Sequence, residues 1–287
     1  MIVPASSDDA LLSDIASAPE DGTLHFWWLG QSGFLLKCGS FYALIDPYLS
    51  DSLTRKYAGT QKEHVRMTAR CIDPARLGFV QLVAASHMHT DHCDPETLGP
   101  LARAAKLSGT RAKLLLPRSG LAMAKERLAG AEFDYIAIDA TESVQVGPLV
   151  IKAIASAHPT VERDGNGACL FLGYIIRLGN FAVYHSGDTL WHAGLMPQLL
   201  VEHPDVALLP INGNKPERGV AGNLNGTEAA ALAKACGASL AIPHHFGMFK
   251  FNTESPLEFI SACGRLGQNH RVLMCGERWS SIVPITR

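Results

Sequence analysis

The sequence lacks an excess of charge of one sign. Its 25 Lys and Arg residues against 27 Asp and Glu residues give a formal net charge of −2, so no overall field draws the chain to nucleic acid or to an anionic membrane. It also lacks a run of about 18 apolar residues, and no basic stretch with an apolar core stands near residue 1. We therefore expect a cytoplasmic protein that binds neither nucleic acid nor membrane.

Cysteine pairs with metal-ligand spacing are also missing. The seven cysteines are odd in number and scattered, and they contain no C-x-x-C pair, which argues against a disulfide framework and against a zinc ribbon. Repeats, low-complexity tracts and long Pro/Gly-rich linkers are absent too. With 47% hydrophobic and 18% charged residues over 287 positions, the chain predicts one domain over 1–287, with an N-terminal extension at about 1–22.

Apolar runs of β type alternate with helical patterns along the chain. An opening antiparallel meander is followed by mixed hairpins and βα units, which predicts an α/β body of two sheets with helices outside. The expected strands are 24–29, 34–38, 42–45, 79–85, 113–116, 135–138, 149–155, 168–178, 181–185, 206–211, 240–242 and 272–275. The expected helices are 10–18, 95–107, 121–128, 227–236 and 256–266.

One segment is locally basic. Between Arg55 and Arg76 six basic residues face only Glu63 and Asp73, a local net charge of +4 in a chain of net charge −2. Few apolar positions recur there, so we expect an insertion loop over about 48–76. Arg matches phosphate and carboxylate in bidentate geometry, which suits such a loop to an anionic small molecule.

A histidine-rich motif follows the expected strand 79–85 directly. The run Ser86–His92 reads H-x-H-x-D-H, and neutral imidazole together with carboxylate binds zinc and similar divalent ions. Three histidines and one aspartate within six residues cannot all surround one ion without severe backbone strain, whereas alternate positions can face two neighbouring ions. The spacing therefore favours a dinuclear site completed by residues from elsewhere.

Three other residues can complete such a site. His158, Asp188 and His245 each follow an expected strand and stand beside turn residues. Open α/β sheets place their sites at the ends of strands, so each could bring one ligand to the same edge.

These residues match a known family. The segments Trp27–Gly30, Ile45–Pro47, the H-x-H-x-D-H run, Ala157–His158, Tyr184–Asp188 and Ile242–His245 resemble the metallo-β-lactamase fold superfamily. The resemblance runs from about Phe26 to the C-terminus and is greatest to the branch typified by L-ascorbate-6-phosphate lactonase.

The resemblance implies a fold and a ligand set. The fold is an αββα sandwich of two mixed β-sheets with outer helices. One metal would be held by His87, His89 and His158, the other by Asp91, His92 and His245, with Asp188 bridging them. Asp46 would stand behind the ligands and orient a ligating histidine. The choice of His245 over His244 rests on the family's usual placement two residues after proline.

The resemblance also implies an activity. Two divalent ions, zinc or manganese, would share a water and deliver hydroxide to a small lactone or a phosphorylated sugar-acid ester, a lactonase or esterase reaction. Asp91 and Asp188 would be the catalytic carboxylates; Asp91 could also be a metal ligand alone. Arg66, Asn214 and Arg218 are the expected contacts to an anionic small-molecule substrate.

Other functions remain open at this point. A phosphodiesterase or nuclease of the same superfamily is the first alternative, although such enzymes usually carry an added polymer-binding domain. A non-catalytic descendant would show eroded ligands, whereas all seven ligand positions are intact. A flavodiiron-like oxygen reductase would need an appended flavin domain. The sequence also leaves homo-oligomerisation open.

Overall fold

The computed structural model describes residues 1–281 of the chain. The helices are α1 (Asp8–Ser17), α2 (Ser52–Lys56), α3 (Pro95–Leu107), α4 (Leu121–Arg127), α5 (Leu195–Glu202), α6 (Gly226–Ala235) and α7 (Leu257–Leu266). Short 3-10 turns lie at Pro74–Arg76, Arg118–Gly120 and Pro216–Arg218. None of these helices is long and apolar enough to cross a membrane.

Two mixed sheets carry the strands. The 7-stranded sheet has the order β13-β1-β2-β3-β4-β5-β6, formed by β1 (Leu24–Gly30), β2 (Gly33–Cys38), β3 (Phe41–Ile45), β4 (Leu82–Ala84), β5 (Lys113–Pro117), β6 (Asp134–Ile138) and β13 (Arg278–Ser280). The 6-stranded sheet has the order β12-β11-β10-β9-β8-β7, formed by β7 (Ser143–Val146), β8 (Leu149–Ala155), β9 (Leu172–Leu178), β10 (Phe181–His185), β11 (Val206–Pro210) and β12 (Leu240–His244). Strands β3 to β6 are parallel, as are β10 to β12.

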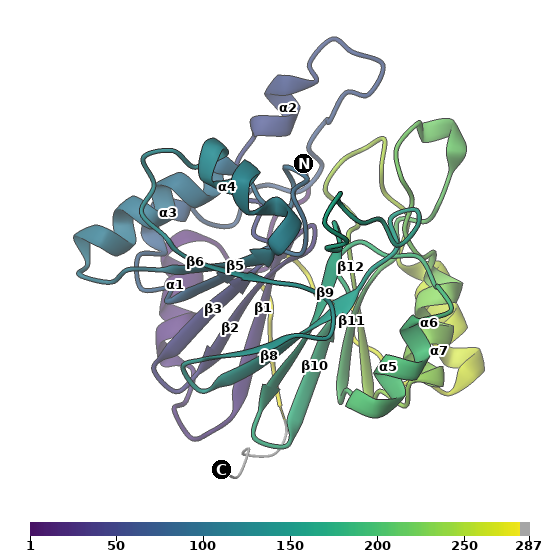
Figure 1. The fold of residues 1–287 in the computed structure, drawn as a ribbon. Coiled ribbons are helices and arrows are strands. Elements are labelled where there is room, and N and C mark those ends of the chain that lie inside the picture. Colours follow the sequence, from purple (N-terminus) through teal and green to yellow (C-terminus); the bar gives the residue numbers. More distant parts are fainter. Residues whose placement is uncertain (282–287) are drawn as a thin grey trace.

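The two sheets stack face to face between two layers of helices (Figure 1). Successive strand side chains point to opposite faces, so Phe26 and Trp28 of β1 enter the core between the sheets, whereas Trp27 packs on the helix side. Helices α1, α3 and α4 cover the first sheet and α5, α6 and α7 cover the second. This arrangement confirms the αββα sandwich expected from the sequence.

Local signals fix several element boundaries. Helix α3 spans the residues that the sequence predicts: Pro95 stands at its first position and the Asp94 carboxylate accepts a hydrogen bond from the Glu96 amide. Helix α6 begins with a capping box. The Asn225 side chain accepts a hydrogen bond from the Glu228 amide, and the Glu228 carboxylate accepts one from the Asn225 amide.

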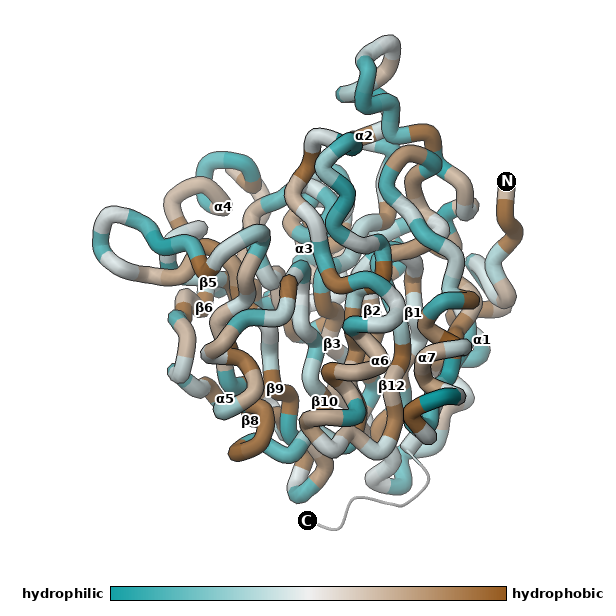
Figure 2. The backbone as a smooth tube through the Cα atoms, turned by 90° about the vertical axis from the view of Figure 1, so that its right-hand side faces the viewer, coloured by the Kyte–Doolittle hydropathy of each residue, from teal (hydrophilic) through white to brown (hydrophobic). Residues whose placement is uncertain are grey.

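The structure corrects the prediction at several places. The apolar run 272–275 forms no strand; Leu273 and Cys275 are buried there, and the edge strand β13 begins only after Gly276. Strand β7 and helix α5 were not expected, since β7 is short and mostly exposed and α5 contains a proline. The basic segment 48–76 contains α2, which projects with its following loop from one end of the sandwich (Figures 1 and 2).

Candidate metal centre

The histidine-rich loop leaves the first sheet at the end of parallel strand β4. Buried Ala84 ends the strand, and the loop delivers His87, His89, Asp91 and His92 before Asp94 starts helix α3. Neighbouring strand β3 ends at Ile45, so Asp46 lies at the same edge. The carboxyl ends of parallel strands therefore bring these polar side chains together.

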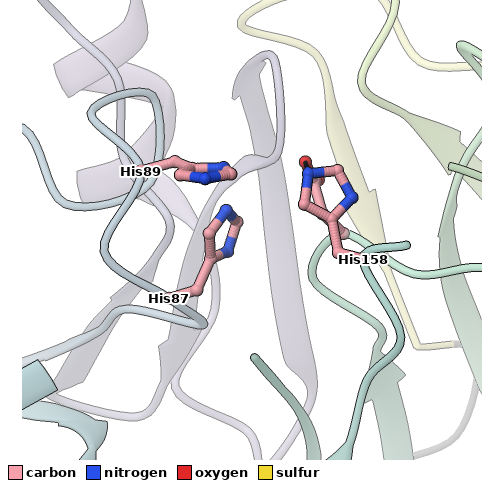
Figure 3. Close-up of side chains that lie close together, drawn as sticks. His87, His89 and His158 are labelled. Atoms are coloured by element: carbon pink, nitrogen blue, oxygen red, sulfur yellow. Dashed lines mark ion pairs between the residues drawn. The ribbon is translucent and has the colours of Figure 1, made fainter. Parts of the chain in front are cut away.

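The second sheet supplies the other candidate ligands at its facing edge. His158 follows β8, Asp188 follows β10 and His245 follows β12 directly. In Figure 3 His87 and His89 from the first sheet point toward His158 from the second. The site thus lies where the ends of both sheets meet.

The seven predicted ligands form two adjoining clusters. The ligand atoms of His87, His89, His158 and Asp188 all lie within 4.8 Å of one another, and so do those of Asp91, His92 and His245.

Asp188 stands between the clusters. Its Oδ1 lies 3.3 Å from His92 Nε2, while its Oδ2 lies 3.3 Å from His245 Nε2 and 3.7 Å from His158 Nε2. One carboxylate therefore faces histidines of both clusters, the place that the sequence assigns to a bridging ligand.

Several atoms of the clusters are buried without a hydrogen-bond partner. His87 Nε2, His92 Nε2 and Asp188 Oδ1 are inaccessible to solvent and accept or donate no hydrogen bond. Such groups are costly unless something satisfies them. A divalent metal would do so, and imidazole with carboxylate suits zinc, manganese and iron alike. The residues present therefore fit divalent metal ions.

Buried residues behind the ligands fix their orientation. The Asp46 carboxylate accepts from His92 Nδ1 at 2.7 Å and from the Ser86 amide and hydroxyl, each at 2.6 Å. His158 Nδ1 lies 2.9 Å from the Gly222 carbonyl oxygen. In both histidines Nδ1 is occupied by this hydrogen bond, so Nε2 faces the cluster and is free to bind a metal.

The structure separates His245 from its neighbour. His245 contributes Nε2 to the second cluster. His244 instead lies with Nδ1 3.1 Å from the Ser32 hydroxyl, and its ring stacks on His185 at 4.8 Å. The geometry therefore places His245, and not His244, in the second cluster.

Burial and neighbouring charges shift the pKa values of the histidines and of Asp188 in the clusters. Burial lowers the pKa of His92, but the carboxylates of Asp188, Asp46 and Asp91 outweigh burial and raise it well above the ordinary value. The pKa of His245 is raised in the same way, chiefly by Asp188. Burial and neighbouring histidines hold the pKa of His87 well below its usual range. Burial alone would raise the pKa of Asp188, yet His245 and His92 lower it well below the ordinary value.

Metal binding is expected to release protons and to weaken as the pH falls. Only a neutral imidazole can bind a metal, and the raised pKa values keep His92 and His245 protonated above the ordinary histidine pKa. Zinc added to metal-free protein at pH 7, followed with an indicator dye, should release about one to two protons per chain. The release should shrink as the pH rises through these raised pKa values, so a release that grows steadily with pH would contradict this account.

The same shifts set the stability of the metal-free chain. Because the pKa values of His92 and His245 are raised in the fold, their ion pairs stabilise it below about pH 6.5. That contribution is lost as the pH rises through the raised values.

The three expected substrate contacts lie elsewhere. Arg66 is turned inward, with its side chain only 7% exposed; its Nε donates to Asp51 at 2.6 Å. Arg218 pairs with Glu254 and donates to the Thr253 carbonyl. Asn214 is exposed and packs against Gly222. None of the three lines the cavity over the clusters. The sequence shows where basic residues gather, but it does not show which of them are already paired with a carboxylate.

A cavity of about 440 Å³ opens over the clusters. Its lining includes five ligands together with residues that the sequence did not single out: Lys56, Tyr57, Lys62, His64, Arg127, Phe251 and Asn252. The His64 ring stacks on Tyr57 at 4.5 Å, and burial lowers its pKa. Lys56 and Lys62 belong to the basic segment, which was the one signal for them in the sequence.

Comparison with known proteins places the chain in a family. The family model described as "Beta-lactamase superfamily domain" matches residues 42–246. A protein of Thermoplasma acidophilum named a metal-dependent hydrolase is 26% identical over 241 residues, which cover 84% of this chain and 91% of that protein.

Solved structures show the same fold. A metallo hydrolase of Ignicoccus hospitalis superposes with a TM-score of 0.65 at 21% identity over 91% of this chain and 99% of its own. A diiron β-hydroxylase of Streptomyces venezuelae superposes with a TM-score of 0.67 at 15% identity over 92% of this chain and 54% of its own. The match over residues 42–246, together with the αββα sandwich and its His/Asp clusters, shows that this chain belongs to the beta-lactamase superfamily domain family, within the metallo-β-lactamase fold superfamily.

Proposed function

We propose that the protein is a metal-dependent hydrolase of a small lactone or a phosphorylated sugar-acid ester, similar to the L-ascorbate-6-phosphate lactonase branch of its superfamily. The two adjoining His/Asp clusters that share Asp188 carry this proposal. They would hold two divalent ions, zinc or manganese. The relative from Thermoplasma acidophilum, whose name describes a metal-dependent hydrolase, adds support for the reaction class.

Divalent ions supply Lewis acidity and lower the pKa of water toward 7. The chain's own residues position the reaction. Both carboxylates line the cavity, but the Asp188 side chain is only 4% exposed, whereas that of Asp91 is 18% exposed. Asp91 is therefore the carboxylate that can reach a substrate and carry a proton to its leaving oxygen.

The charges around the cavity favour an anionic substrate. Arg55, Arg66 and Arg76 of the basic segment are each paired with a carboxylate. Lys56 and Arg127 line the cavity instead and pair with no carboxylate in the part of the chain described. The carboxylates that line the cavity, Asp91 and Asp188, belong to the clusters. Cations left unpaired beside a metal centre suit a phosphate or carboxylate group on the substrate.

A panel of lactones, phosphomonoesters and phosphodiesters tests the reaction class. The protein, loaded in turn with zinc and manganese, should hydrolyse a lactone or sugar-acid ester faster than a phosphodiester. Faster hydrolysis of phosphodiesters would replace the proposal with the phosphodiesterase alternative. Inactivity toward all three classes with both metals bound would refute the hydrolase.

Lys56→Ala is expected to raise the KM for a phosphorylated lactone about tenfold, because a charge-assisted contact is worth at least about 1.4 kcal/mol. The KM for the same lactone without the phosphate should stay unchanged. Arg55→Ala is the matched control, since Arg55 neighbours Lys56 on α2 but pairs with Glu96 and lies outside the cavity lining. Equal effects of Lys56→Ala on both substrates would contradict the assignment.

A further inference from the structure

The second cluster is assembled from opposite sheets. Asp91 comes from the loop after β4 in the first sheet, and His245 follows β12 in the second. Their mutual position depends on what holds the two edges together. The tight turn between β1 and β2 lies there, and it contains Gln31.

Gln31 contacts both of these ligands. Its side-chain Nε2 donates to Asp91 Oδ2 at 2.8 Å and lies 3.1 Å from His245 Nε2. Its backbone carbonyl accepts from the His245 amide at 2.8 Å and from the Trp28 indole at 2.9 Å. The residue is 1% exposed, and its Oε1 is buried without a hydrogen-bond partner. One uncharged residue thus ties a ligand of each sheet to the same turn.

The backbone of Gln31 is held in an unfavourable conformation. Its φ is +49°, a left-handed value that side chains other than glycine rarely adopt. Within residues 1–281 six non-glycine residues have positive φ, and three of them, Gln31, Asp46 and His245, belong to or contact the clusters. Strained residues of this kind persist where the surrounding structure fixes a functional geometry. Gln31 therefore belongs with the ligands and with Asp46.

We propose that Gln31 is a positioning residue that sets the affinity of the second metal position. Its carboxamide N–H holds Asp91 and its backbone carbonyl holds the His245 amide, so that the two ligands keep one mutual position on the same turn. The inference rests on the two-ion centre of the proposed function. Groups that orient metal ligands typically change metal affinity by about 10-fold to 100-fold when they are removed.

Gln31→Gly tests the role with little risk to folding. Glycine adopts the left-handed φ without a steric penalty, which offsets part of the stability lost with the buried carboxamide, so the metal-free variant should still fold. Calorimetric titration with Zn²⁺, and with Co²⁺ followed by its absorption spectrum, should show one ion bound as in the wild type and the other about 10-fold to 100-fold more weakly. A purely structural residue would lower the melting temperature and leave both affinities unchanged.

Gln31→Leu removes the carboxamide but keeps much of its volume. Leucine donates no N–H to Asp91 and offers no metal ligand, so the second affinity should fall here too. Ser32→Ala is the matched control, because Ser32 shares the turn but its hydroxyl contacts His244 outside the clusters; both affinities should stay at the wild-type value.

The outcomes separate this inference from the function on which it rests. Unchanged second affinity in Gln31→Gly or in Gln31→Leu would overturn the role of Gln31. Two ions in the wild type would still leave the metal centre intact. Fewer than two ions in the wild type would overturn the two-ion centre, and this inference with it.

Discussion

Asp188→Ala is expected to abolish hydrolysis and to remove metal from both clusters. Within residues 1–281, Asp188 is the one carboxylate that faces His92, His158 and His245 together. Its loss would leave the first cluster with imidazole alone and the second with Asp91 as its one carboxylate. Because bound metals contribute several kcal/mol to the reaction, the rate should fall by about three orders of magnitude or more. Metal content by mass spectrometry and initial rates measure both effects.

The matched control for this prediction is His270→Ala. His270 lies outside both clusters, and its ring packs edge-on against Phe259 at 5.8 Å. That variant should keep its metal and its activity. Equal metal content in the Asp188 and His270 variants would show that Asp188 is not shared between the clusters.

The candidate ligands could be identified from the sequence because their signal is local. The H-x-H-x-D-H run follows an apolar strand, and His158, Asp188 and His245 each follow another. Strand ends are where such sheets gather functional side chains, so the topology brings all seven residues to one edge. Which atoms approach each other depends on the packing of one sheet on the other, whereas the place of Asp188 between the clusters is already implied by the family resemblance.

The cations around the site could not be assigned in this way. The sequence shows the local excess of charge but not its partners: Arg66, which the sequence predicts as a substrate contact, pairs with Asp51. Arg127 comes from helix α4, outside the basic segment, yet it lines the cavity. Gln31 gave no chemical signal, since an uncharged residue in a turn between two strands is ordinary until its contacts are known.

The fold by itself does not decide the reaction. The same sandwich superposes on a metallo hydrolase and on a diiron β-hydroxylase at similar TM-scores. Function therefore resides in the ligands, the residues that orient them and the cavity above them. Substitutions that separate metal binding from folding are the most informative experiments on this chain.

Asp46→Asn is such a substitution, and we expect it to weaken metal binding by about 10-fold to 100-fold. The Asp46 carboxylate accepts three hydrogen bonds, from His92 Nδ1 and from the amide and hydroxyl of Ser86. A carboxamide has one acceptor oxygen, so at least one of these donors would face an N–H₂ group. The His92 proton would no longer be held at Nδ1, and Nε2 would lose its fixed role as the metal-facing lone pair. Calorimetric titration with zinc measures the affinity.

Asp46→Asn should also change the metal-free protein. Because Asp46 helps to raise the pKa of His92, that pKa should fall in the variant, and a buried unsatisfied donor should cost about 1–3 kcal/mol of unfolding free energy. Asp94→Asn is the matched control: Asp94 is equally buried but bonds Thr97 and Ser52 at the start of α3. Both variants should be destabilised, whereas only Asp46→Asn should weaken zinc binding. Equal zinc affinities in the two would mean that the carboxylate behind His92 supports the fold and not the metal.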